Sequence, residues 1–358
     1  MTVKTLTTEN LSHLAAALLA DGTEVIAPVK DSSGKVDYRA VKQAAELALG
    51  EALPRKSLKE FFLPQTECLF YFKQVKNDVE LTPVPTTFGP RIVLGAKPCD
   101  AAAVDILDRV FDWDYHDELW FGRRQATTIV TLACPMVDEF CFCTAVDIEP
   151  ATRQGADMVI VPVAGGYHVE TVTEKGEALV TKYAKYFSDG GKQAEADTFR
   201  AEAKAKVEKN LGINTKDVRA WLETHFEDGL WHELAWRCHG CGACAAVCPT
   251  CHCFDIVDES EGVNQGTRRR NWDTCQAGKF TLHASGHNPR GEQCNRCRQR
   301  VSHKFMIYPE RFGVLLCTGC GRCVRACPGG MVLPEVLRRV NAAAQAAKTE
   351  PVTEGVGQ

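Results

Sequence analysis

The chain has 358 residues, 45% of them hydrophobic, which is enough for two or three domains with ordinary cores. A net charge of −4 and a pI near 6.2 argue against a nucleic-acid binder, and no segment approaches the roughly 18 uncharged apolar residues of a membrane helix. Residues 1–22 have the pattern of an amphipathic helix rather than a signal peptide, so we expect a cytoplasmic protein. Eighteen cysteines in that compartment indicate metal or redox chemistry rather than disulfides.

The first part of the chain alternates between helical and extended patterns. A helix is predicted over 8–20, and an extended segment over 24–29 is followed by a turn at 31–35. Short apolar runs predict four buried strands, at 68–73, 91–96, 127–133 and 158–164. An acidic cap followed by helical periodicity predicts a helix over 100–111. We therefore expect residues 1–214 to form an α/β or mixed α+β domain with some parallel strand pairing.

The second part of the chain has a different composition. Five cysteines precede residue 237, whereas thirteen lie between 238 and 327, which marks a domain boundary. Charged and helical patterns predict helices over 192–211, 215–236 and 333–348. We assign 341–358 to a disordered tail, and the last helical pattern extends into the start of this tail. Residues 215–340 are predicted to be an α-helical, ferredoxin-type dicluster domain. The stretch between Cys248 and Cys317 is too long for a tight hairpin, so packed helices must bring the two ends together.

A cysteine pattern, C-x2-C-x2-C-x3-C-P, occurs twice, at 238–249 and 317–328. It is the spacing that holds 4Fe–4S clusters in bacterial two-cluster ferredoxins, where the fourth cysteine of each run ligates the other cluster. Glycines between the cysteines permit tight turns, and the closing prolines end the loops. Zinc is the alternative, but the spacing suits it poorly. The predicted ligands are Cys238, Cys241, Cys244 and Cys327 for one cluster, and Cys317, Cys320, Cys323 and Cys248 for the other.

A third metal site is a further candidate. Cys99 and Cys134 each follow an apolar strand, so parallel pairing of these strands would bring both sulfurs to the same sheet edge, where open α/β sheets bind ligands. Cys141 and Cys143, in a C-x-C one loop later, could complete four ligands. The alternative is that all four are small buried hydrophobic residues. Cys68, inside an apolar strand, is predicted to lie in the core.

Five other cysteines lie within the predicted cluster domain, and we expect them to contact the clusters as weak S–H donors rather than to bind another metal: Cys251, Cys253, Cys275, Cys294 and Cys297. Basic segments at 267–271 and 296–304 are interpreted as solvated faces, with a docking patch or positive charge near the clusters as alternatives. No nucleotide-binding glycine motif follows a strand, so we predict no catalytic residue and no cofactor beyond the clusters.

Several segments, in this order along the chain, carry a family resemblance: 57–67, 95–104, 141–144, 248–255, 270–275, 286–291, 298–305 and the second cysteine run. Together they resemble the iron–sulfur subunit family that includes the beta subunit of sulfhydrogenase-type nickel–iron hydrogenases and the A subunit of anaerobic sulfite reductase. The resemblance implies a cytoplasmic subunit that carries electrons through two 4Fe–4S clusters on the residues named above. It also implies a flavin- and nicotinamide-binding partner and a catalytic partner. Cys294 and Cys297 depart from the family pattern, which leaves open a heterodisulfide-reductase-type or flavin oxidoreductase partner.

The leading hypothesis is therefore an electron-transfer subunit of an anaerobic oxidoreductase complex, with two or three 4Fe–4S clusters. A stand-alone thiol or disulfide redox enzyme, which would use the other cysteines, is an alternative from a different class. A zinc-stabilised interaction module is a third.

Overall fold

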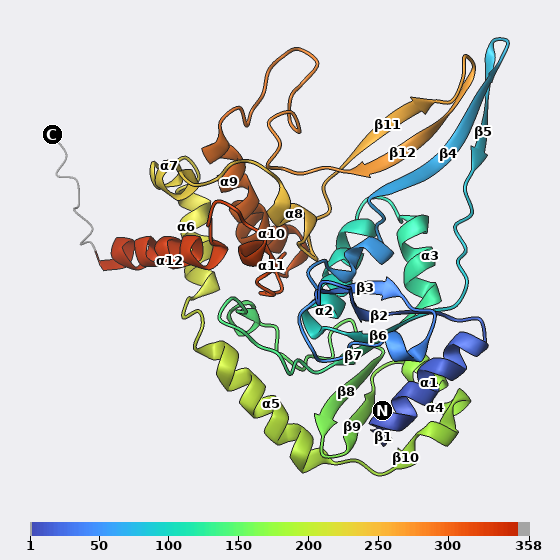
Figure 1. Ribbon diagram of the computed structural model, residues 1–358. Coiled ribbons are helices and arrows are strands. Elements are labelled where there is room, and N and C mark those ends of the chain that lie inside the picture. The colour runs from blue at the N-terminus through green and yellow to red at the C-terminus, as the bar shows by residue number, and fades with distance from the viewer. Residues whose placement is uncertain (1, 350–358) are drawn as a thin grey trace.

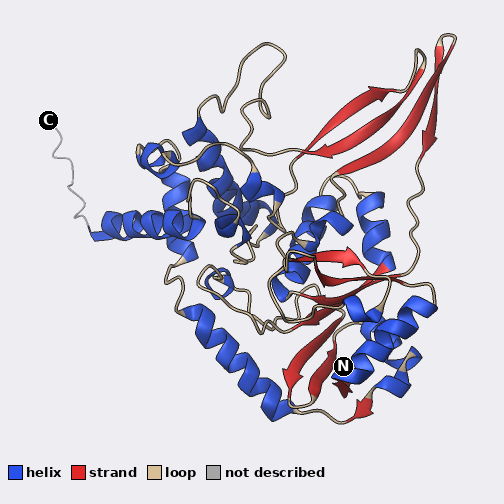
Figure 2. Cartoon of the chain, viewed as in Figure 1, coloured by secondary structure: helices blue, strands red, loops and turns tan. Residues whose placement is uncertain are grey.

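The computed structural model describes residues 2–349. It contains a main sheet with flanking helices, a four-stranded sheet that projects from it, and a helical region that carries both cysteine runs (Figure 1). Figure 2 shows that most strands belong to the first two parts and that the third is almost entirely helix and loop. Across residues 2–349, no helix combines the length and apolarity that crossing a bilayer requires.

The main sheet has eight strands in the order β10-β1-β9-β8-β7-β6-β2-β3. Strands β2, β6, β7 and β8 pair in parallel, and the outer strands pair antiparallel. The predicted parallel pairing is thus confirmed. The strands are β1 Val3–Thr7, β2 Glu24–Lys30, β3 Val36–Ala40, β6 Arg91–Ala96, β7 Thr127–Leu132, β8 Met158–Val163, β9 Gly166–Thr171 and β10 Ser188–Asp189.

Helices cover both faces of this sheet, and the strands supply apolar side chains to each face in turn. Val25 packs toward α1 and α4, whereas its neighbour Ile26 packs toward α2 and α3, as the two-residue period of a strand requires. The near-continuous apolar runs are therefore explained by burial on both sides. The helices predicted at 8–20, 100–111 and 192–211 are confirmed; the full set is α1 Thr8–Ala20, α2 Pro98–Phe111, α3 Glu118–Ala126, α4 Glu174–Lys182 and α5 Gln193–Glu208.

The projecting sheet joins segments that are far apart in the chain. Its order is β11-β12-β4-β5, with β4 Thr66–Val75, β5 Asp78–Pro83, β11 Phe254–Ser260 and β12 Gln265–Trp272. Arg270 pairs in register with Glu67 and forms an ion pair with it. The strand predicted at 68–73 is confirmed, but its burial was wrong: β4 is largely half-buried or exposed, and Cys68 is half-buried rather than in the core. The hairpin β11–β12 was not predicted, because its charged sequence lacks an apolar alternation.

The helical region consists of α6 Thr215–Thr224, α7 Leu230–Ala235, α8 Ala243–Ala246, α9 Gln293–Ser302, a π-helical turn His303–Ile307, α10 Tyr308–Phe312, α11 Arg322–Arg325 and α12 Leu333–Thr349. The single helix predicted over 215–236 is wrong. The chain breaks after Thr224, and the Asp228 carboxylate accepts a hydrogen bond of 2.7 Å from the Leu230 amide, which starts a new helix.

The last helix extends further than predicted. Helix α12 continues to Thr349, so residues 341–349 are helical and are not a disordered tail; residues 350–358 lie outside the described part. Val340 and Ala344 are buried in the same apolar cluster as Trp221 and Leu222 of α6, which explains why the helix persists. This packing holds α12 against the helical region.

Candidate iron–sulfur centres

One cavity of the helical region, which we call the outer cavity, gathers five cysteines of the two runs together with Cys297. Its lining includes all four residues predicted for one cluster, Cys238, Cys241, Cys244 and Cys327, and also Cys323 of the second run. Gly242 begins α8 with a φ of +75°, a conformation that side chains rarely adopt and that lets the loop turn sharply between the cysteines. Cys241 is exposed, so this cavity lies close to the surface.

A second group of cysteines, the middle group, consists of Cys248, Cys317, Cys320 and Cys323. Burial raises the pKa of Cys317 to about 12 and that of Cys323 to about 11, and it also raises the pKa of Cys320. In each case the nearby Cys248 sulfur adds to the increase. The last cysteine of the first run therefore lies close to the first three of the second run.

All four candidate residues of the third site line one further cavity, which we call the rim cavity: Cys99, Cys134, Cys141 and Cys143. Cys99 lies in the first turn of α2, just after β6, and Cys134 follows β7. Their strands are parallel neighbours, so both sulfurs lie at the same sheet edge. Burial raises the pKa of Cys141 to about 11 and that of Cys143 to about 12. The four sulfurs therefore share one cavity at the sheet edge.

The second cysteine run packs directly on the loop that carries the C-x-C. The Phe142 amide donates a hydrogen bond of 2.8 Å to the Gly319 carbonyl. Gly319 has a φ of +62°, and a Cβ added there would lie 2.5 Å from the Cys143 backbone, so only glycine permits this approach. The middle group and the rim cavity are therefore neighbours.

A buried ion pair connects the second cysteine run, which carries three cysteines of the middle group, to the start of α2 at the rim cavity. Arg322, which precedes Cys323, donates hydrogen bonds of 2.8 and 2.6 Å to the two carboxylate oxygens of Asp100, which follows Cys99. Tyr38 donates a hydrogen bond of 2.7 Å to the same carboxylate. Both charges are fully buried, so removing either one would leave the other uncompensated. The pair fixes the second run against α2, and sequence reasoning missed it.

Buried cations beside these cysteines test whether the cavities suit an iron–sulfur cluster. Lys97 is fully buried near Cys134, and no hydrogen-bond partner for its Nζ is found in the described residues. Arg300 lines the outer cavity, and its Nε and Nη2 likewise lack a partner there. Buried charges are normally paired, so unpartnered donors beside thiolate ligands fit an anionic group such as a 4Fe–4S cluster.

Two further lysines surround the middle group. The Lys304 Nζ donates to the Cys248 sulfur at 3.4 Å and to the Leu316 carbonyl at 2.9 Å. Lys59, from η2 Leu58–Phe61, donates to the Cys251 carbonyl at 2.8 Å. The interpretation of 267–271 and 296–304 as solvated faces is wrong for Arg270 and Arg298, which are buried. It is also wrong for Arg300 and Lys304, which are buried beside the cysteines. Their positions favour the alternative of positive charge near the clusters.

Of the remaining cysteines, two lie beside predicted ligands and two lie beside each other. The Cys251 sulfur is a hydrogen-bond neighbour of Cys248, Cys297 of Cys238, and Cys253 of Cys275. Gln293 also donates to the Cys238 sulfur at 3.2 Å, a contact that sequence reasoning missed. Contacts of Cys251 and Cys297 with predicted ligands agree with the expected S–H donor role.

Comparison with known proteins adds two findings. Residues 237–331 match the family described as the 4Fe-4S dicluster domain. The chain is 30% identical over 316 residues to Sulfhydrogenase 2 subunit beta of Pyrococcus furiosus (strain ATCC 43587 / DSM 3638 / JCM 8422 / Vc1), an alignment that covers 88% of this chain and 92% of that protein. No solved structure gives a significant match. The chain therefore belongs to the family of the sulfhydrogenase 2 beta subunit and contains a 4Fe-4S dicluster domain.

Proposed function

We propose that this protein is the electron-transfer subunit of a hydrogenase-type oxidoreductase complex and that it relays electrons through three 4Fe–4S clusters. One observation carries the proposal: the middle group contributes Cys323 to the lining of the outer cavity and Cys320 to that of the rim cavity. These two cysteines are three residues apart, Cys320 just before α11 and Cys323 within it. Three sites in contiguous order are what an electron relay requires.

We assign the ligands of the three clusters as predicted: Cys238, Cys241, Cys244 and Cys327; Cys248, Cys317, Cys320 and Cys323; and Cys99, Cys134, Cys141 and Cys143. A bound 4Fe–4S cluster supplies a centre that accepts and releases an electron. The chain's own residues exclude water and hold positive charge beside the sulfurs. Lys97, Arg300 and Lys304 offset the negative charge that thiolate ligands bring into a buried site.

The relay has two ends at which partner subunits can dock. At the outer cavity, Cys241 is exposed and Trp236, two residues before Cys238, is 82% exposed. At the rim cavity, Met136 is 47% exposed, and its carbonyl accepts a hydrogen bond of 3.3 Å from the Cys134 thiol. Exposed large apolar side chains mark interaction surfaces more often when they adjoin a functional site. We assign one end to a flavin- and nicotinamide-binding partner and the other to a catalytic partner.

We further assign residues 1–214 to a docking domain and 215–340 to the dicluster domain, with β11 and β12 extending back to pair with β4 of the first. Cysteine-ligated clusters persist in reducing compartments, which supports a cytoplasmic complex. The family relationship to a protein named as a sulfhydrogenase subunit supports an assembly of several subunits.

Activity of the isolated chain distinguishes a relay from a stand-alone thiol enzyme. The isolated chain, purified anaerobically, should accept electrons from dithionite and fail to oxidise NADH or NADPH. In a second experiment, the chain extracted anaerobically from its native cells should co-purify with a flavoprotein. The buried position of Cys251, Cys275 and Cys297 favours the relay, because thiol exchange requires access to the sulfur. Turnover of a nicotinamide or disulfide substrate by the isolated chain would overturn the proposal.

A further inference from the structure

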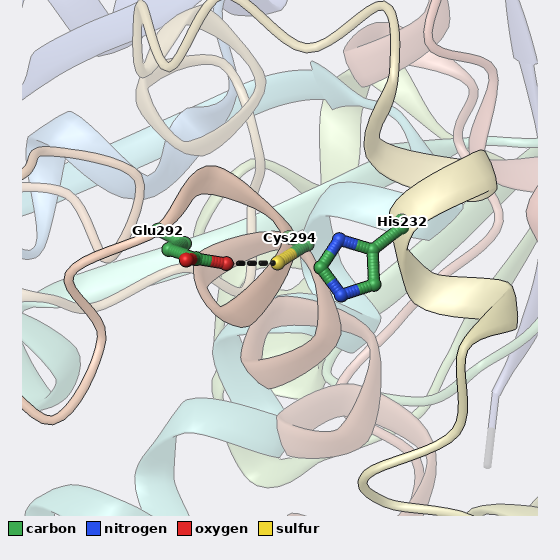
Figure 3. A group of neighbouring side chains, drawn as sticks. All are labelled: His232, Glu292 and Cys294. Atoms are coloured by element: carbon green, nitrogen blue, oxygen red, sulfur yellow. Dashed lines mark hydrogen bonds between the residues drawn. The ribbon is translucent and has the colours of Figure 1, made fainter.

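The C-x2-C on α9 divides its two sulfurs between different surroundings. Cys297 lies beside Cys238 of the outer cavity, whereas Cys294 lies beside His232 of α7 and Glu292. Figure 3 shows the thiol of Cys294 between the carboxylate of Glu292 and the imidazole of His232. The ligand atoms of these three side chains all lie within 4.8 Å of one another.

We propose that His232, Glu292 and Cys294 bind a divalent zinc-type cation, separate from the clusters. A thiolate, an imidazole nitrogen and a carboxylate oxygen are all zinc ligands, and three of them leave the fourth tetrahedral position to water. The charges also balance, because one thiolate and one carboxylate offset the two positive charges of the ion.

Without the ion, the Cys294 thiol donates a hydrogen bond of 3.3 Å to the Glu292 carboxylate. Zinc would replace that proton, which is released to solvent when the Zn–S bond forms. The thiol is buried, whereas His232 and Glu292 are exposed, so the ion can enter from the surface without disturbing the core. Because binding releases the thiol proton of Cys294, zinc affinity should rise with pH.

The site would connect two elements that border the outer cavity. Helix α7 ends just before Cys238, and Ala235 at its end packs against Cys294 and Cys297 of α9. An ion that joins His232 to Cys294 would hold α7 against the start of α9. The inference depends on residues outside the three proposed cluster sites, so it stands or fails independently of the proposed function.

The test uses the full chain with its clusters, purified anaerobically and dialysed against zinc chloride at graded concentrations. Bound zinc and iron are measured together by mass spectrometry. One zinc per chain is expected, and zinc-edge X-ray absorption should show one sulfur at about 2.3 Å with nitrogen and oxygen ligands at about 2.0–2.2 Å. Substitutions Cys294→Ser and His232→Gln should each weaken zinc binding at least about tenfold and leave iron unchanged.

A matched control is His13→Gln, which changes an exposed histidine on α1 and should leave zinc binding unchanged. Zinc surrounded only by sulfur would overturn the proposal, because it would mean that zinc had taken cluster cysteines. Unchanged zinc affinity in both ligand variants would overturn it as well. His232→Gln alters an exposed side chain, so it remains a valid test if Cys294→Ser fails to fold.

Discussion

Replacing Lys304 by methionine should lower the reduction potential of the cluster that Cys248 binds. Lys304 is fully buried, and its pKa is raised because the nearby Cys248 and Cys251 sulfurs outweigh the opposing effect of burial, so it carries its charge at neutral pH. A positive charge stabilises the reduced, more negative form of a cluster. Methionine keeps the approximate size of the side chain and removes the charge.

The magnitude follows from the contact of 3.4 Å between the Lys304 Nζ and the Cys248 sulfur. If the charge is about 6 Å from the cluster centre in an effective dielectric of about 20, Coulomb's law gives about 2.8 kcal/mol. A one-electron couple changes by about 59 mV for each 1.4 kcal/mol, so the potential should fall by about 120 mV. Screening by the surrounding residues makes half of that value a reasonable lower bound.

Redox titration monitored by electron paramagnetic resonance measures this potential in anaerobically purified protein of verified iron content. Lys304→Arg retains the charge and should shift the potential much less. Lys279→Met, which removes an exposed lysine of the same region, serves as the matched control. A potential in Lys304→Met within about 20 mV of the unaltered protein, with its clusters intact, would refute the electrostatic reasoning.

Three further predictions concern ligation and stability. Cys248→Ala should alter the spectrum of the cluster held by Cys317, not the one altered by Cys241→Ala; perturbation of the same single cluster by both would contradict cross-ligation. Burial lowers the pKa of His252 to about 4. As pH falls, the imidazole is therefore protonated in the unfolded chain before it is in the folded chain, and about 2 kcal/mol of stability should be lost between pH 7.5 and 5. Chemical denaturation should show a flatter dependence of stability on pH for His252→Gln. Leu337→Ala, at a fully buried position of α12, should cost about 2–5 kcal/mol, measured as a lower melting temperature; an unchanged value would mean that α12 does not pack as described.

Local patterns in the sequence predicted much of the fold. Strands β6, β7 and β8 and helices α1 and α2 were located from apolar periodicity, because each is determined by residues close together in the chain. The parallel pairing then placed Cys99 and Cys134 at one sheet edge. The doubled cysteine run similarly predicted that Cys248 lies with the second run, since ligand spacing constrains the loop regardless of what surrounds it.

Features that depend on distant contacts could not be predicted in this way. Pairing of β12 with β4 joins residues about 200 positions apart, and the charged hairpin shows its role only against that partner. The ion pair of Arg322 with Asp100 and the burial of Lys97 look like ordinary surface charges in the sequence. Burial is a property of the assembled chain, so the cations beside the cysteines became recognisable only in three dimensions.

Iron content distinguishes three clusters from two. We expect about twelve irons per anaerobically purified chain, from three 4Fe–4S clusters, and about eight in Cys143→Ala, because that substitution removes a ligand of the rim cavity alone. Measured by mass spectrometry against protein concentration from amino-acid analysis, about eight irons in the unaltered chain, unchanged by Cys143→Ala, would contradict the three-cluster relay.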